Sequence, residues 1–261
     1  MIYSRMDNRT PELIRYRQFL PFAGVEAFTT TKNGWPVENP RFTGDSSDLY
    51  AENRRRLAQL LEIEPGQLVF PRQTHTDCVA VIEEPPAAEL KDTDALVTNR
   101  RGICLCVQTA DCVPLLMYDP EVGAVAAVHA GWRGTFSRIA AQTVATLVRT
   151  YGSNPAGLRI AIGPSIGPAD YEVGDEVAAL FRREFDFAEE ILTQKPDGKF
   201  LLDLWEANRR QLLEQGVWAA HIEISRQCSF RETGKFHSAR REGISTGRMV
   251  SGIMLRDGNF P

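Results

Sequence analysis

Two histidines and one cysteine are the side chains whose types and settings best suit chemistry. His75 lies in PRQTHTD, between two segments of strand character, and His129 ends the apolar run GAVAAVHA just before GWRG. Cys112 lies in QTADCVPLL, where a new strand is expected to start. The end of a strand, next to the start of a helix, is a common position for a functional group. These three residues are therefore the first candidates for a reactive centre.

Imidazole nitrogen and thiolate sulfur are donors that zinc favours in tetrahedral sites. Three protein ligands leave the fourth coordination position to water or substrate, which is the arrangement of catalytic zinc. The wide spacing of residues 75, 112 and 129 fits a site assembled across a fold, and the sequence has no Cys-x-x-Cys pair of the zinc-ribbon type. Taken singly, each histidine is more often a hydrogen-bonded structural residue, and Cys112 a buried apolar one.

Composition narrows the class of protein. The chain has 261 residues, 43% hydrophobic and 25% charged, which predicts a single globular domain over residues 1–261 with a peripheral segment at about 1–25. The net charge of -4 gives no global positive field to attract nucleic acid. No stretch approaches the roughly 20 apolar residues of a membrane span, and the first thirty residues lack a signal-peptide core. We therefore expect a cytoplasmic protein without nucleic-acid or membrane partners.

Strand-like and helix-like patterns alternate from end to end. Strands rich in Val, Ile and Leu are expected at residues 79–82, 103–107, 113–118, 124–128, 158–162, 222–225 and 249–255. Helices are expected at 134–151, 173–185 and 202–215, with Gly152 closing the first and Gly216 the last. Strands joined by short turns, with helices interspersed, indicate an α+β fold with mixed sheets.

Several motifs together resemble a known family. The segments PRQTH, DALVT, TADCVP, HAGWRG, AIGPSIGP, YEVG and FHSARREGISTGRM are similar to those of the laccase-domain family, also called the YfiH-type or polyphenol-oxidoreductase family. The likeness covers roughly residues 28–255, and the TADCVP and HAGWRG pair is its most specific part. It implies a layered α/β/β/α sandwich with mixed sheets. It also implies a zinc-dependent purine nucleoside phosphorylase, with purine nucleoside and phosphate as substrates and adenosine deaminase as a side activity.

The same resemblance carries the family's metal ligands onto His75, Cys112 and His129. Its early Gly-Asp and Asn-Arg elements match the four residues Gly44, Asp45, Asn53 and Arg54.

The chain departs from the family pattern in three places. Thr76 follows the first histidine where the family has Gly, Lys32 replaces an early Arg, and VENPRFTGD replaces a Ser-Leu-Asn motif. The departures concern the phosphate or sugar contacts of the early loop and leave the three metal ligands intact.

Phosphorolysis requires an anion site, for which arginine is suited by its bidentate, charge-assisted hydrogen bonds. The candidates are Arg54, Arg133 and Arg248, with Arg240 and Arg241 behind them. Arg133 gains weight because it lies at an expected helix start, where anions bind well. The Gly-Pro loop that begins at Gly163 is a candidate for wrapping a ligand with backbone groups, and a plain rigid turn is its other interpretation.

Deamination requires an acid–base group, and Asp94 and Asp111 are available for it. Asp111, beside Cys112, is expected more as a structural support than as the base. The His-x-Glu with Pro-Cys-x-x-Cys signature of cytidine-type deaminases is absent. The aromatic residues Trp35, Phe42 and Tyr171 can stack on a base, although core packing is the expected role of each.

Other functions remain open on the same residues. A cysteine hydrolase would use Cys112 as nucleophile and His75 or His129 as base. A trinuclear copper cluster needs more imidazoles than four histidines supply, so a multicopper laccase is not buildable, although copper can substitute for zinc at a single site. A copper-dependent phenol oxidase and a non-catalytic zinc protein are the remaining alternatives.

Overall fold

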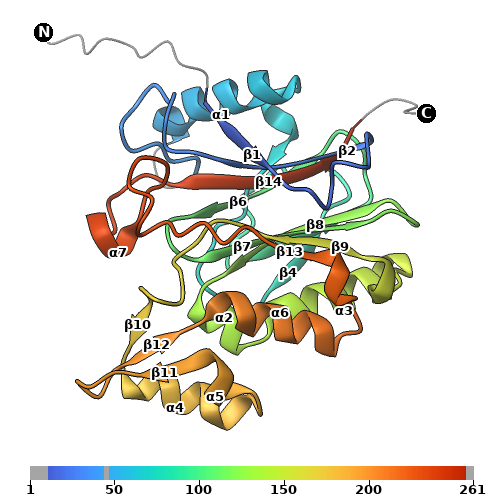
Figure 1. The fold of residues 1–261 in the computed structure, drawn as a ribbon. Coiled ribbons are helices and arrows are strands. Elements are labelled where there is room, and N and C mark those ends of the chain that lie inside the picture. Colours follow the sequence, from blue (N-terminus) through green and yellow to red (C-terminus); the bar gives the residue numbers. More distant parts are fainter. Residues whose placement is uncertain (1–10, 44–46, 257–261) are drawn as a thin grey trace, which may run out of the picture.

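Two mixed β-sheets packed face to face form the centre of the molecule (Figure 1). The structure is a computed structural model that describes residues 11–43 and 47–256. In this part of the chain one sheet has the order β1-β2-β14-β6-β3 and the other has the order β13-β9-β7-β8-β5-β4. The strands of the first sheet are β1 Leu13–Arg15, β2 Val25–Thr30, β14 Met249–Leu255, β6 Cys104–Thr109 and β3 Leu68–Val69. Those of the second are β13 Ile222–Ile224, β9 Arg159–Ile162, β7 Val113–Asp119, β8 Ala124–Ala130, β5 Ala95–Thr98 and β4 Val79–Val81.

Helices cover the outer faces of both sheets (Figure 1). Helix α1 lies on the first sheet, whereas α2, α3 and α6 lie on the second. The α-helices are α1 Ser47–Leu61, α2 Trp132–Phe136, α3 Ile139–Tyr151, α4 Asp175–Glu184, α5 Ala188–Ile191, α6 Leu204–Glu214 and α7 Ala239–Glu242. A small third sheet consists of β10 Glu172–Val173, β12 Phe200–Leu202 and β11 Leu192–Gln194, and the short 3-10 helices are η1 Pro65–Gln67, η2 Pro155–Gly157 and η3 Ala219–His221. The expected α+β sandwich with mixed sheets is thereby confirmed.

Alternation along the strands builds three apolar layers. In β6, Leu105 and Val107 point between the two sheets, whereas Cys104 and Cys106 point toward Leu57 of α1. Both faces of the strand are therefore buried, which explains why its sequence is apolar throughout. Cys104 and Cys106 are therefore core residues.

The second sheet repeats this arrangement. Leu116 of β7 lies between the sheets, and its neighbours Leu115 and Met117 face the helical layer, where Val144 and Leu147 of α3 pack. The sheet that carries the reactive residues is thus fixed on both sides.

The helix expected at residues 134–151 is two helices. Arg138, between α2 and α3, adopts a left-handed backbone with φ of 60°. Its guanidinium pairs with Glu184 at 2.9 Å and with Glu214 at 2.8 Å, which ties the break to two other helices. Gly152, with φ of 74°, ends α3 as expected.

The other two expected helices begin later than predicted. Glu172 and Val173 pair with β12 as a strand, so α4 begins only at Asp175. Helix α6 begins at Leu204 because the Asp203 side chain accepts a hydrogen bond from the backbone N–H of Glu206, as an N-cap does.

The N-terminal segment contributes to the core in the part that is described. Tyr16 and Phe19 are 1% and 3% exposed and pack between the sheets. The expected boundary at about residue 25 concerns a segment of which residues 1–10 lie outside the described residues. Among the described helices, none is long and apolar enough to cross a membrane.

The Gly-Pro loop after β9 begins in the space between the sheets. A Cβ atom at Gly163 would lie 2.7 Å from the Tyr16 hydroxyl oxygen and 2.9 Å from Pro114 Cγ. Both neighbours are held in the core, so neither can move away at low cost. Close packing is therefore what this position requires.

We predict that Gly163→Ala lowers the free energy of unfolding by about 1–3 kcal/mol, because the added methyl group overpacks the core. Gly157→Ala is the matched control, since nothing lies within 4 Å of the Cβ that it adds. Urea unfolding of the two variants measures the difference. Equal stability of the two variants would contradict the packing explanation.

Candidate metal centre

The three candidate ligands converge on one point. His75 lies in the loop between β3 and β4, Cys112 in the turn before β7, and His129 near the end of β8. One ligand atom from each residue lies within 4.8 Å of the other two, and Cys112 Sγ is 3.7 Å from His75 Nε2. Ligand atoms around a tetrahedral zinc ion are separated by roughly 3.3–3.8 Å, given bonds of about 2.0–2.3 Å. The described residues therefore present a metal site that needs little rearrangement.

A buried carboxylate organises both histidines. Asp94, 0% exposed, precedes β5 and accepts a hydrogen bond of 2.6 Å from His129 Nδ1. The same carboxylate accepts the backbone N–H groups of Thr74, His75 and Thr76, together with the Thr76 hydroxyl, at 2.9–3.1 Å. These hydrogen bonds hold His75 at a φ of 65°, a left-handed conformation that residues other than glycine rarely adopt. Because Nδ1 of His129 is engaged, its Nε2 is free to bind a metal.

Electrostatics favour the thiolate form of Cys112, whereas His129 must release a proton when a metal binds. Burial raises the pKa of Cys112, but the charge and hydrogen bond of His129, with the contact to His75, lower it to about 6. Burial lowers the pKa of His129, whereas Cys112 and Asp94 raise it to about 9. Without a metal, the pair is therefore a thiolate and an imidazolium at neutral pH. Burial raises the pKa of Asp94, but the bond from His129 and the backbone donors lower it to about 2, so it stays ionised.

Gly131 leaves room for the cluster. A Cβ atom there would lie 2.8 Å from His75 Cδ2 and 3.1 Å from Cys112 Sγ. Glycine is thus required by the close approach of two ligands, which is an independent sign that the site is built for their convergence. The donor set of two nitrogens and one sulfur suits zinc and also accepts copper.

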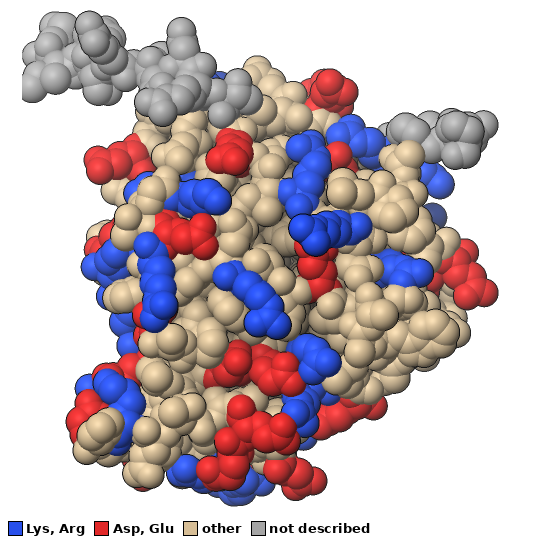
Figure 2. Space-filling view, viewed as in Figure 1, with Lys and Arg blue, Asp and Glu red and all other residues tan. Residues whose placement is uncertain are grey.

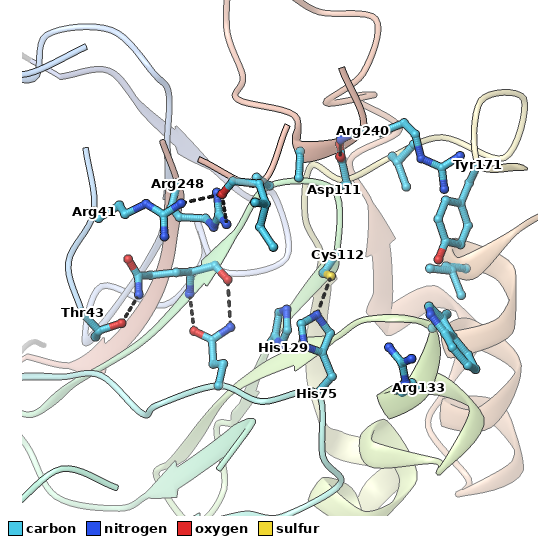
Figure 3. Close-up of a pocket in the computed structure, with 18 of the residues that line it drawn as sticks. Arg41, Thr43, His75, Asp111, Cys112, His129, Arg133, Tyr171, Arg240 and Arg248 are labelled. Atoms are coloured by element: carbon cyan, nitrogen blue, oxygen red, sulfur yellow. Dashed lines mark hydrogen bonds between the residues drawn. The ribbon is translucent and has the colours of Figure 1, made fainter. Parts of the chain in front are cut away.

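The triad opens into a cavity of about 630 Å³, within the ordinary range for small-molecule sites (Figure 3). His75 is exposed, Cys112 is partly exposed and His129 is buried. The described residues that line the cavity include five arginines, namely Arg41, Arg72, Arg133, Arg240 and Arg248. On the face shown in Figure 2, by contrast, basic and acidic side chains are interspersed. The five arginines that converge on the cavity favour an anionic ligand there.

Asp111 lines the cavity but is already fully engaged. Its carboxylate accepts hydrogen bonds from the hydroxyls of Ser229 at 2.6 Å and Ser238 at 3.0 Å, and from the backbone N–H of Arg240 at 2.7 Å. Its φ of 95° lies in a region that residues with a Cβ avoid. The residue thus joins the turn before Cys112 to the segment before α7, which agrees with the supporting role expected for it.

The structure separates the other expected contacts into two groups. Arg133 and Arg248 line the metal cavity, whereas Gly163 and Arg54 do not. Arg54 donates from Nε to the Phe42 carbonyl at 2.6 Å and borders a neighbouring groove. Asp45 and Gly44 lie outside the described residues.

Several residues at the cavity were missed or underrated, among them Arg41, Gln108 and Tyr171. Arg41 lies within VENPRFTGD, whose departure from the family pattern hid its role, and Gln108 at the end of β6 carried no signal. Tyr171 lines the cavity and is only partly buried, whereas Trp35 and Phe42 are core residues as expected.

The family assignment follows from comparison with known proteins. The family model described as multi-copper polyphenol oxidoreductase laccase matches residues 37–256, and the chain belongs to this family. A Bacteroides thetaiotaomicron protein named purine nucleoside phosphorylase is 36% identical over 259 residues, covering 93% of this chain and 96% of its own. A protein named adenosine deaminase RL5, from an unknown prokaryotic organism, is 41% identical over 246 residues, 88% of this chain and 94% of its own.

A solved structure shows the same fold. The Bacillus licheniformis hypothetical protein YfiH matches with a TM-score of 0.87 at 34% identity, covering 97% of this chain and 98% of its own. The resemblance inferred from the motifs is thereby confirmed.

We predict that Asp94→Asn weakens zinc binding by about 10–100-fold, because the amide cannot accept all the hydrogen bonds that orient the two histidines. Asp92→Asn is the matched control, since Asp92 is exposed and its side chain accepts a hydrogen bond only from the Thr74 hydroxyl, while its bond from the Thr76 hydroxyl is made by the unchanged backbone carbonyl. Competition with a zinc chelator measures both affinities. Equal affinities would show that the Asp94 carboxylate does not support the site.

We also predict a pH dependence for alkylation of Cys112 in metal-free protein. The lowered pKa keeps the thiolate present above pH 6, so the iodoacetamide rate should be flat there and fall about tenfold for each unit below it. A Cys78→Ser background removes the exposed thiol, and the cysteines other than Cys112 are then all buried. Mass spectrometry of the labelled peptide gives the rate. A rate that keeps rising up to pH 9 would contradict the lowered pKa.

Proposed function

We propose that the protein is a zinc-dependent purine nucleoside phosphorylase that acts on adenosine, inosine or guanosine, with methylthioadenosine as a further substrate and adenosine deamination as a second activity. The observation that carries the proposal is the shared cavity, where a metal triad and a set of arginines face the same space. The names of two relatives, a purine nucleoside phosphorylase and an adenosine deaminase, support the substrate class.

The arginines that line the cavity suit the binding of the phosphate that phosphorolysis requires. Within the described residues, Arg41, Arg133, Arg240 and Arg248 show no salt bridge to a carboxylate. Burial and the nearby Arg41 lower the pKa of Arg248, so two like charges share one region. Unpaired cations are costly to hold in a partly buried site. An anion with several oxygens, such as phosphate, offsets that cost through charge-assisted hydrogen bonds.

The chain's own residues organise the site for a metal. His75, Cys112 and His129 would hold it, Asp94 fixes the imidazole of His129, and Asp111 fixes the wall around Arg240. Zinc held there supplies Lewis acidity toward a substrate atom or water. Because Asp111 already accepts three hydrogen bonds from the protein, we assign it to positioning and not to proton transfer.

A cysteine hydrolase is the second candidate, and one observation favours it. The order Cys112, His129, Asp94 places a thiolate next to an imidazolium that a carboxylate orients. This is the general arrangement of an activated nucleophile. The phosphorylase remains the better-supported function because a cysteine hydrolase does not account for the unpaired arginines.

Turnover is the test of the proposal. Zinc-loaded protein given inosine or adenosine with phosphate should release the free base and ribose 1-phosphate, and removal of the metal should abolish the release. Cys112→Ser should lose both zinc and turnover, whereas Cys78→Ser, which changes an exposed thiol, should keep both. Absence of base release with zinc and phosphate present would refute the phosphorylase. Full activity in metal-free protein, blocked by iodoacetamide, would establish the thiol enzyme instead.

A further inference from the structure

The cavity has two chemically different ends, separated by the metal triad (Figure 3). Arg41, Arg248 and Thr43 lie on one side of Cys112 and the two histidines. Tyr171, Arg240 and Arg133 lie on the other side. The proposed phosphorolysis requires the cavity to bind two unlike groups, the phosphate polyanion and the flat purine ring of the nucleoside. We therefore ask which end of the cavity suits which group.

At the first end, two guanidiniums are held close together by backbone carbonyls. Arg41 Nη2 donates to the carbonyls of Ile244 at 2.5 Å and Thr246 at 3.2 Å. Arg248 donates to the same two carbonyls at 3.1 Å and 2.7 Å, and to that of Gly247 at 3.0 Å. Neither shows a salt bridge to a described carboxylate, and both are partly buried. Two neighbouring positive charges without a carboxylate partner favour the binding of an anionic ligand.

Thr43 adds an oriented hydroxyl to this end. The backbone N–H of Phe42 donates to Gln108 Oε1 at 2.8 Å, which fixes the orientation of the Gln108 amide. The amide nitrogen must then donate to Thr43 Oγ1, 2.6 Å away. Because the Thr43 oxygen accepts this bond, its own hydrogen is turned away from Gln108 and is available to a ligand in the cavity.

The second end is aromatic. Arg240 donates twice to the Glu172 carbonyl, at 3.0 Å each, and its guanidinium lies 5.4 Å from the centre of the Tyr171 ring. The Arg133 guanidinium lies 4.4 Å from the centre of the Trp132 ring. These two arginines are exposed to solvent. Leaving their charges without an anionic partner therefore costs less free energy than it does for Arg41 and Arg248. Rings with cationic edges suit a purine, which leaves phosphorolysis carrying negative charge.

We propose that Arg41, Arg248 and Thr43 bind inorganic phosphate, and that Tyr171 with Arg240 binds the purine ring across the metal triad. The assignment rests on the phosphorylase function. It moves Arg133, expected from the sequence as a phosphate ligand, to the base end of the cavity. It also makes Thr43 and Tyr171 residues that determine which substrate each end accepts.

Paired substitutions test the assignment in zinc-loaded protein. Thr43→Val removes the hydroxyl at nearly constant shape and should raise the KM for phosphate roughly tenfold or more, since a hydrogen bond to a charged group is lost. Thr43→Ser keeps the hydroxyl and should restore the KM. Tyr171→Leu removes the ring and should raise the nucleoside KM about three- to tenfold, whereas Tyr171→Phe should not.

The pattern across the two substrates decides the outcome. We expect the Thr43 pair to change the phosphate KM and the Tyr171 pair to change the nucleoside KM. A reversed pattern, or equal effects on both substrates, would overturn the assignment, as would a Thr43→Ser variant that behaves like Thr43→Val. Melting temperatures of all four variants identify any change that acts through unfolding.

Binding measurements distinguish a failure of the two-ended cavity from a failure of the phosphorylase function. If the wild-type protein releases no base, the phosphorylase function is refuted. Calorimetry with inorganic phosphate or with adenosine still measures the affinity of each end. Binding of phosphate weakened by Thr43→Val, and of adenosine weakened by Tyr171→Leu, would support the two-ended cavity without turnover. Failure of both ligands to bind would refute it.

Discussion

The hydrogen bonds that the Asp94 carboxylate accepts are the interactions on which the rest of the centre depends. One buried anion receives the ring of His129 and three consecutive N–H groups of the loop that carries His75. Two ligands from distant parts of the chain are thereby set by a single group. The arrangement also explains why the loop tolerates a left-handed residue, since the hydrogen bonds to Asp94 compensate for the local strain.

The two-sheet sandwich places this carboxylate and its partners. Asp94 immediately precedes β5 and lies opposite His129 of β8, because β5 pairs with β8 and the backbone N–H of His129 donates to the Asp94 carbonyl. Cys112 immediately precedes β7, the strand on the other side of β8. Apolar packing on both faces of the sheet fixes these strands, and with them the positions of Cys112 and His129. Function and core are thus coupled through strand pairing.

The motifs predicted more of the metal centre than of its surroundings. His75, Cys112 and His129 were identifiable because their residue types are rare and because the family motifs PRQTH, TADCVP and HAGWRG contain them. The fold class followed from periodicity and from the family resemblance. Arg138 broke an expected helix because ion pairs to other helices outweighed the local pattern, and no local pattern contains such partners. Gly163 was expected at the ligand, but what constrains it is the Tyr16 hydroxyl, 147 positions earlier in the chain.

Both ends of the cavity depend on contacts between distant segments, which the sequence does not encode locally. Arg41 reaches the cavity because Asn53 of α1 holds its carbonyl, and Tyr171 because Arg240 packs beside it. The metal centre itself is the claim most open to direct measurement. X-ray absorption at the zinc edge should show one sulfur at about 2.3 Å and two imidazole nitrogens at about 2.0–2.1 Å. A coordination shell of nitrogen and oxygen without sulfur would contradict a site built from His75, Cys112 and His129.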